Sequence, residues 1–263
     1  MKTKNIGTIL IMLSVFITAE VFGLYVTQSY VSKDIPYGIE APDVEEAYTP
    51  WTIITGILVA TVILYLMLKY KLNLFVRIWY VVAVTICLSI TFSLFIGEIF
   101  ALIIAFMTAL IKIKEKDLYF HNITEIMLYA GLVVIFSPIF NITTAIILLI
   151  AISVYDIIAV FGTKHMIVFA KRQSKLGFFP GLIVQYKKEV SILGGGDVGF
   201  TLFFATVVSR ASGINHGLMI IAGAVIGLLV IFIFGKKKKF YPAMPFISAG
   251  MFLMYFISSV LFA

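Results

Sequence analysis

Long apolar runs separated by short polar stretches dominate the chain, and most of the runs approach 20 residues. A helix needs about 20 predominantly apolar residues to cross the hydrocarbon core of a bilayer. The pattern therefore predicts an all-α polytopic membrane protein with nine transmembrane helices. The predicted spans are residues 6–26, 51–68, 78–96, 98–111, 122–140, 142–161, 197–211, 216–234 and 242–262.

Two of these boundaries need an argument of their own. Residues 78–111 are too many for one crossing, and we divide them at Gly97-Glu98. The first run follows Met1-Lys2-Thr3-Lys4 and could imitate a signal peptide. It is longer than the usual apolar core of such a peptide and lacks a clean A-x-A cleavage site, so we interpret it as a retained span.

The composition agrees with a chain that lies almost wholly in the membrane. It is 62% hydrophobic and 13% charged, with a mean hydropathy of +1.10. Soluble domains are about half apolar and a quarter charged. We therefore expect one membrane-embedded domain over residues 1–263. The single cysteine, Cys87, excludes an intrachain disulfide.

The distribution of positive charge predicts the orientation. In the nine-span layout, 18 of the 20 Lys and Arg residues fall on one side of the membrane, and only Lys33 and Arg210 fall on the other. Cytoplasmic loops carry an excess of Lys and Arg. We therefore expect a multi-pass protein of the cell membrane with a cytoplasmic N-terminus and an external C-terminus. The net charge of +7 lies in these loops and is not a nucleic-acid signature.

Five acidic residues lie at membrane depth, where an ionised Asp at a helix centre costs at least about 2.5–3.5 kcal/mol. They are Glu20, Glu98, Glu125, Asp156 and Asp197. We interpret Glu98 and Glu125 as helix-end or interface groups, and Glu20 as a structural group whose partner the sequence does not name.

Asp156 and Asp197 have a more specific setting. Both lie near the predicted cytoplasmic ends of adjacent, oppositely directed spans, and both flank the loop 162–191. Two carboxylates that meet share one proton, because both cannot easily ionise. One can then take a proton from water while the other polarises a carbonyl, as in an aspartic protease.

Two further motifs accompany the aspartates. Gly194-Gly195-Gly196 precedes Asp197 and could leave room for a substrate backbone, or could simply make a flexible helix start. The stretch Tyr241–Pro245 carries two prolines three residues apart, which disfavours helix and leaves free backbone groups. The alternative is an ordinary helix start with proline in its first turn.

The ordered set of Tyr155-Asp156, Gly194-Gly195-Gly196-Asp197 and Pro242-Ala243-Met244 resembles the presenilin and signal peptide peptidase family of intramembrane aspartyl proteases. The resemblance implies a presenilin-like bundle in which Asp156 and Asp197 are the catalytic pair. It implies that Tyr155 and the glycine and proline motifs belong to the active site or bind substrate. Met244 stands where the family has leucine, and Gly195 where animal relatives usually have leucine.

The same resemblance shapes the reading of the loop 162–191. The loop is short, like that of a compact archaeal-type member, which implies no obligatory partner subunits and leaves a homo-oligomer open. Lys164, Lys171, Arg172 and Lys175 share one helical face, which predicts an amphipathic helix at the membrane surface. Residues 182–186 are β-prone. They either form a strand that pairs with unwound substrate or pack as an ordinary loop on the bundle.

Other classes of protein fit less well. There is no H-E-x-x-H and no G-x-S-x-G, and His121, His165 and His216 are scattered, so we expect no metal and no cofactor. Prepilin and preflagellin leader peptidases also use Gly-x-Gly-Asp, but they have fewer spans and lack the proline motif. The alternative from another class is a transporter or channel in which the two aspartates relay protons or bind cations. The expected partners are transmembrane peptide substrates and the lipid bilayer, and no nucleic acid.

Overall fold

The structure is a computed structural model, and it describes residues 6–39, 72–115, 117–163, 179–187, 189–234 and 241–262, together with scattered positions between 52 and 70. Eight helices can be bounded within these residues, and each overlaps one predicted span. They are α1 (Ile6–Ser29), α3 (Asn73–Ile96), α4 (Glu98–Lys114), α5 (Leu118–Phe136), α6 (Ile142–Ile157), α8 (Gly195–Ser212), α9 (Ile214–Phe234) and α10 (Met244–Leu261).

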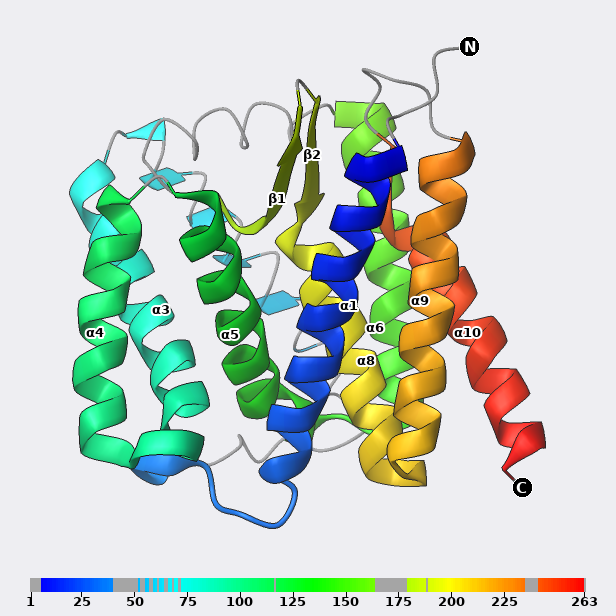
Figure 1. The fold of residues 1–263 in the computed structure, drawn as a ribbon, viewed down its shortest axis with the longest axis horizontal. Coiled ribbons are helices and arrows are strands. Elements are labelled where there is room, and N and C mark those ends of the chain that lie inside the picture. Colours follow the sequence, from blue (N-terminus) through cyan, green and yellow to red (C-terminus); the bar gives the residue numbers. More distant parts are fainter. Residues whose placement is uncertain are drawn as a thin grey trace.

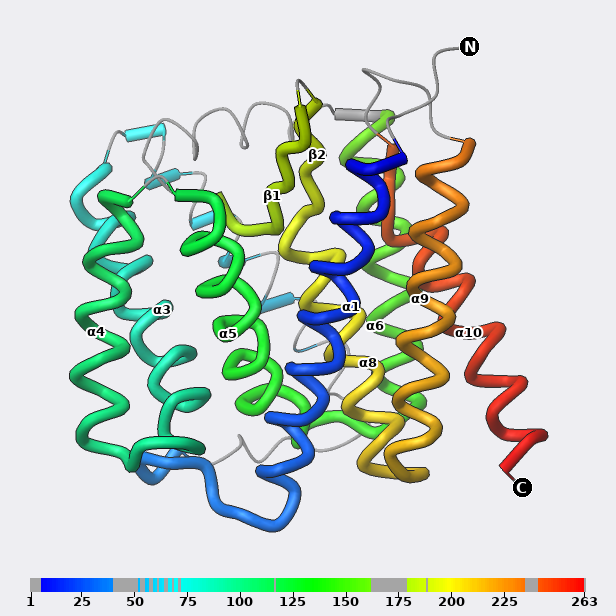
Figure 2. Tube along the Cα trace, in the orientation of Figure 1, coloured from blue at the N-terminus to red at the C-terminus, as the bar shows by residue number. Residues whose placement is uncertain are grey.

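The helices stand side by side in one bundle (Figure 1), and α1 lies in its middle against α5, α8 and α9. The antiparallel pair α3 and α4 forms one edge, and α9 and α10 form the other. The tube in Figure 2 shows that α1 and α3 both run from the end of the bundle near the N-terminus to the opposite end. The chain must therefore return once between them, and the described positions between 52 and 69 are helical.

Local sequence signals explain where several helices begin and end. Asp117 caps α5 by accepting a hydrogen bond from the Phe120 N–H at 2.8 Å. Asn141 and Thr144 form a reciprocal capping box at the start of α6. The predicted break between the third and fourth spans is present, because Gly97 has a φ of 74° that glycine adopts without strain.

Two short elements and one hairpin interrupt the helical pattern. A 3-10 turn (Pro36–Gly38) follows α1, and a second one (Ser137–Ile139) follows α5. Strands β1 (Gly181–Tyr186) and β2 (Glu189–Gly194) pair antiparallel, with Gly181 opposite Gly194. The all-α prediction is therefore wrong in this detail: the β-prone run was recognised, but its partner strand was taken as loop. The hairpin stands at the end of the bundle where α1 begins.

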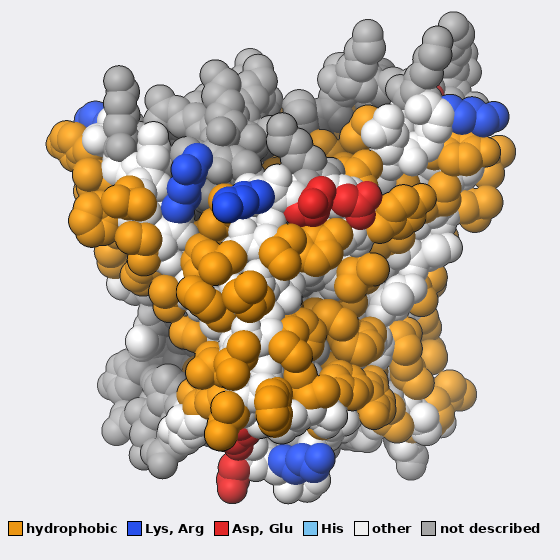
Figure 3. Space-filling view, turned by 60° about the vertical axis from the view of Figure 1, so that its left-hand side comes forward, with side chains coloured by type: hydrophobic (Ala, Val, Ile, Leu, Met, Phe, Trp, Pro, Cys, Tyr) orange, Lys and Arg blue, Asp and Glu red, His pale blue; other side chains and the backbone are white. Residues whose placement is uncertain are grey.

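Six helical segments are long and apolar enough to cross a membrane by length and composition: residues 6–29, 73–96, 118–139, 142–161, 214–234 and 244–261. The prediction of a multi-pass membrane protein is confirmed at this level. The described helices α4 and α8 overlap two of the three remaining predicted spans but do not meet that criterion. Figure 3 shows apolar side chains over the middle of one face and charged side chains near its two ends, as expected for a belt in contact with lipid.

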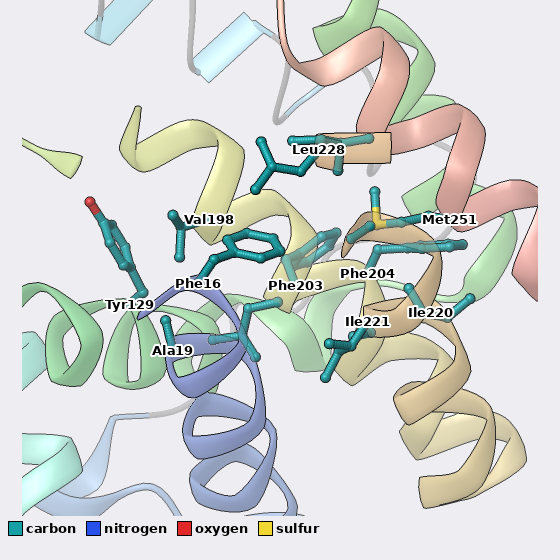
Figure 4. Close-up of a cluster of buried hydrophobic side chains, with 14 of the residues drawn as sticks. Phe16, Ala19, Tyr129, Val198, Phe203, Phe204, Ile220, Ile221, Leu228 and Met251 are labelled. Carbon is teal, nitrogen blue, oxygen red and sulfur yellow. The ribbon is translucent and has the colours of Figure 1, made fainter. Parts of the chain in front are cut away.

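Close packing holds the bundle together where hydrophobic burial contributes little, because lipid tails are as apolar as the side chains. A large buried cluster joins α1, α5, α8, α9 and α10, with Phe16, Phe203 and Phe204 among its members (Figure 4). Gly223 and Gly250 allow α9 and α10 to touch backbone to backbone, since a Cβ on Gly250 would lie 2.1 Å from the Gly223 carbonyl oxygen. This contact holds α10, and with it the proline motif, against the bundle.

Some predictions fall on residues that the structure leaves undescribed. The predicted amphipathic helix around Lys164–Lys175 lies outside the described residues, and so do the four lysines at 236–239. The predicted second span is described only in part.

Candidate active site

Asp156 lies near the end of α6, where the α-helix gives way to a π-helical turn over Ile158–Thr163. Such turns are rare and are found frequently at functional sites. The side chain is buried, and its Oδ2 accepts a hydrogen bond from the backbone N–H of Met244 at 3.1 Å. The carboxylate therefore faces the start of α10. Tyr155, which the resemblance assigned to the site, is 48% exposed, and the structure does not bring its ring into the buried site.

Asp197 lies in the first turn of α8, at the position three residues after the N-cap residue Gly194. A carboxylate there is stabilised by the helix dipole and by free backbone N–H groups. The Gly194 N–H donates a hydrogen bond to this carboxylate, and Asp197 interacts electrostatically with Asp156. The structure thus brings together the two aspartates that the sequence singled out, from the facing ends of α6 and α8.

The proline motif supplies the third side of this site. Tyr241 and Pro242 lie outside the helix, and α10 begins at Met244 with Ala243 as its N-cap residue and Pro245 in its first turn. Both sequence interpretations therefore apply: the backbone before Met244 is non-helical, and Pro245 stands at an ordinary helix start. Met244 is 2% exposed, and its N–H reaches Asp156 because Pro242 and Ala243 hold the preceding backbone outside the helix. Met244 thus contributes its backbone to the site, whichever apolar side chain it carries.

The three glycines before Asp197 have different surroundings. A Cβ on Gly194 would lie 3.2 Å from the Asp197 Oδ2, and a Cβ on Gly195 would lie 2.4 Å from the Tyr129 hydroxyl oxygen. A Cβ on Gly196 would meet nothing closer than 3.8 Å, and Gly196 is exposed. The open space that the sequence suggested for a substrate backbone is therefore found beside Gly196, whereas Gly195 is packed against α5.

The β-hairpin leads directly into this glycine segment, and one of its edges is already occupied. The Asn122 side chain exchanges two hydrogen bonds with the Ile183 backbone, at 2.7 and 2.9 Å, much as a neighbouring strand would. In an antiparallel pair, opposite residues share the same hydrogen-bonding state. Because Ile183 faces α5, its partner Ile192 turns its own N–H and C=O away from β1. Among the described residues, no backbone group bonds to Ile192 at the outer edge of β2.

Glu125 differs from its sequence interpretation as a helix-end or interface group. It lies in the second turn of α5, is 1% exposed, and forms an ion pair with Lys112 of α4 at 3.1 Å. This interpretation is therefore wrong. The charge patterning contained a signal, since Lys112 and Glu125 end and begin neighbouring antiparallel helices. Their pairing could be recognised only if the bounds of both helices were known.

The other two acids fit their interpretations more closely. Glu98 is exposed and lies in the first turn of α4, where the helix dipole favours it. Glu20 is fully buried in α1, and neither of its carboxylate oxygens has a hydrogen-bond partner among the described residues. Within the same part of the chain, no group of three or more His, Cys, Asp or Glu residues is placed to hold a metal ion.

Comparisons with known proteins identify the family and the fold. The family model described as signal-peptide peptidase, presenilin aspartyl protease matches residues 13–197. Two solved structures of a presenilin family intramembrane aspartate protease share the fold. The one in space group C222 has a TM-score of 0.73 and 19% identity, and covers 96% of this chain and 99% of its own. The one in space group P2 has a TM-score of 0.70 and 20% identity, and covers 94% and 96%. None of the curated proteins compared with the chain matches it.

Proposed function

Because the chain belongs to the signal-peptide peptidase and presenilin family of aspartyl proteases, we propose that it hydrolyses peptide bonds within the transmembrane helices of membrane proteins or leftover signal peptides. The chain is a multi-pass membrane protein. It is an aspartic endopeptidase of the intramembrane-cleaving type. The observation that carries the more specific proposal is the approach of Asp156 and Asp197 at the end of the bundle, each with a backbone N–H donated to its carboxylate.

The proposed reaction needs one proton on the aspartate pair. The ionised aspartate takes a proton from water, and the water oxygen attacks the carbonyl carbon of the scissile peptide. The protonated aspartate donates its proton to the carbonyl oxygen. Collapse of the tetrahedral diol then breaks the C–N bond. One diol hydroxyl returns its proton to the pair as the carbonyl re-forms, and the amide nitrogen leaves with the other proton of the pair. The pair ends the cycle with one proton, as it began.

A helical substrate must unwind before this reaction, since its peptide carbonyls are hydrogen-bonded and shielded within the helix. We place the unwound segment along the outer edge of β2, where Val190 and Ile192 are each 58% exposed. Addition of a strand to an exposed edge pairs the free backbone groups of both partners. This refines the sequence interpretation, which assigned the pairing strand to 182–186, because the outer edge of β1 is taken by α5.

The membrane layout of the proposal has nine spans with a cytoplasmic N-terminus. It is supported by the return of the chain between α1 and α3, and by the gathering of Lys and Arg in alternate loops. In this layout Asp156 and Asp197 lie near the cytoplasmic side, where water can reach them. We further propose that the protein acts without obligatory protein subunits.

The test is cleavage of a helical transmembrane peptide by the full chain in liposomes. We expect cleavage that a hydroxyl-bearing transition-state isostere blocks, and we expect Asp156→Asn and Asp197→Asn to reduce it by roughly 10⁴-fold or more, as removal of an essential catalytic group does. Full activity in either variant would refute the two-aspartate mechanism. Ion or proton flux through the liposomes without cleavage would favour the transporter alternative instead.

A further inference from the structure

The ion pair between Lys112 and Glu125 is buried beside the site but takes no part in the proposed reaction. The side chains are 2% and 1% exposed. The Lys112 ammonium also donates to the Thr124 hydroxyl and to the His121 carbonyl oxygen, so all three of its N–H groups are used. Buried pairs of this kind are weak evidence for stability, because desolvation opposes the attraction between the charges. Its position therefore suggests another role.

The second oxygen of Glu125 connects this pair to the β-hairpin. Glu125 Oε2 accepts hydrogen bonds from the Tyr129 hydroxyl and from the Gly181 N–H, the latter at 3.1 Å. The Gly181 carbonyl oxygen lies 2.9 Å from the His121 Nε2. Side chains of α5 thus hold both backbone groups of the residue that begins β1.

The hairpin connects Gly181, which α5 holds in place, with the start of α8. Gly181 is opposite Gly194 in the sheet, and the Gly195 N–H donates to the Pro180 carbonyl oxygen at 3.2 Å. The Tyr129 ring rises from α5 beside the first turns of α8 (Figure 4), and its hydroxyl closes the space at Gly195. Asp197 follows two residues later and interacts electrostatically with Tyr129.

We propose that Glu125, paired with Lys112, is a positioning residue that sets where α8 begins and hence where the Asp197 carboxylate lies. It acts through Gly181 and Tyr129, and the geometry gives it no contact with substrate. One carboxylate oxygen must accept two hydrogen bonds while the other faces an ammonium, which explains why an acid occupies this buried position. The proposal rests on the proposed function, since it assigns the role relative to a catalytic Asp197.

Two double variants separate positioning from charge. Lys112→Met with Glu125→Met and Lys112→Met with Glu125→Gln both remove the two charges together, so neither leaves an unpaired buried ion. The glutamine keeps a carbonyl oxygen that can accept from Tyr129 and Gly181, whereas methionine does not. The glutamine double variant is thus the matched control for the methionine double variant.

The first readout is steady-state cleavage of a transmembrane peptide by the full chain in liposomes. We expect the methionine double variant to lower kcat by roughly 10–100-fold with KM within about threefold, because a misplacement of about 1 Å can cost about 10²-fold. We expect the glutamine double variant to recover most of that loss. Equal kcat in the two double variants would overturn the proposal, and so would a change confined to KM.

The second readout does not depend on activity. Hydrogen exchange of the backbone amides over 194–197 should be faster in the methionine double variant than in the glutamine one. If the methionine variant fails to fold, Tyr129→Phe takes its place, and it should show a smaller fall in kcat at unchanged KM. Equal exchange in all variants would refute the positioning role.

The two readouts distinguish failure of the proposed function from failure of the positioning role of Glu125. Absence of cleavage by the wild type would refute the proposed function, while a difference in exchange between the double variants would still support the anchoring of α8. Asp197→Asn should abolish cleavage with exchange of the Gly195 amide unchanged, because that N–H is held by the Pro180 carbonyl oxygen and not by Asp197. This result separates loss of chemistry from loss of position.

Discussion

At the scale of single residues, the three glycines before Asp197 have three different surroundings. Gly194 lets its N–H approach the carboxylate, Gly195 leaves room for the Tyr129 hydroxyl, and Gly196 borders open space. A residue without a Cβ is needed at the first two for packing inside the protein. Only Gly196 has surroundings that suit a substrate backbone.

This difference predicts that one alanine substitution lowers stability and the other lowers cleavage. Gly195→Ala places a methyl group against Tyr129 and should lower the free energy of unfolding by about 1–3 kcal/mol, as overpacking does. Gly196→Ala should change stability by less than about 0.5 kcal/mol, yet lower cleavage because the methyl group occupies the space proposed for substrate. Thermal unfolding in detergent and peptide cleavage measure the two effects. A destabilised Gly196→Ala beside an unaffected Gly195→Ala would contradict the assignment.

The proposed sharing of one proton between Asp156 and Asp197 predicts a bell-shaped dependence of kcat on pH. At low pH both aspartates are protonated and no base remains to activate water, and at high pH both are ionised and no acid remains to protonate the carbonyl. The two limbs belong to Asp156 and Asp197 as a pair. Cleavage rates across the pH range test this, with intact folding checked at each pH. A flat profile from acid to alkaline pH would argue against the pair.

The sequence was most informative for residues whose type is unusual for their place. Asp156 and Asp197 are costly in the membrane and stand in short motifs, so they could be found without a structure. The hydrogen bonds of Glu125 could not, because they depend on how α4, α5 and the hairpin pack. Tyr129 carried no signal at all, since a tyrosine in an apolar helix is usual.

At the scale of elements, the β-hairpin is the feature that the helical pattern predicted least well. The β-prone run at 182–186 indicated one strand, whereas residues 189–194 were divided between the predicted loop 162–191 and the glycine motif, so their part in a hairpin was not recognised. The turn places Lys187 at a φ of 55°, an unusual conformation for a residue with a Cβ. Only the pairing of Gly181 with Gly194 reveals that the hairpin ends at the candidate active site.

The free edge of β2 predicts how a backbone substitution affects substrate binding. Ile192→Pro removes an N–H that points away from β1, so the hairpin should keep its internal hydrogen bonds, since edge positions tolerate proline. We expect KM for a transmembrane peptide to rise roughly tenfold, the equivalent of one lost hydrogen bond of about 1.5 kcal/mol. Ile192→Val is the control, because it keeps the N–H and a β-branched side chain. Unchanged KM in the proline variant would exclude pairing at this edge.

At the scale of the whole molecule, the bundle has the dimensions and surface of a membrane protein. Apolar side chains cover the middle of the face in Figure 3, and charges lie near its ends. Hydrophobic patterning predicted the positions of the eight described helices because each run had to cross the same thickness of lipid. It could not order them in space, since any apolar face can pack on another and the choice depends on contacts such as Gly223 with Gly250.

The arrangement of helices predicts the sides on which the ends of the chain lie. The beginning of α1 and the end of α10 are at opposite ends of the bundle (Figure 1), which an odd number of crossings requires. A reporter fused after Ala263 should therefore be active outside the cell, and one fused before Met1 in the cytoplasm, as loop charges direct. Two reporters on the same side would overturn the nine-span layout.

The hydrogen bond from the Met244 N–H to Asp156 has a practical consequence for capturing a substrate complex. Asp156 belongs to the proposed reactive pair and also binds the start of α10, so changing it alters two properties at once. Among the described residues, the Asp197 carboxylate receives the N–H of Gly194, which lies three positions earlier in the chain. Asp197→Asn is therefore the better substrate trap: it should halt the reaction while leaving the hydrogen bond between α6 and the start of α10 in its native state.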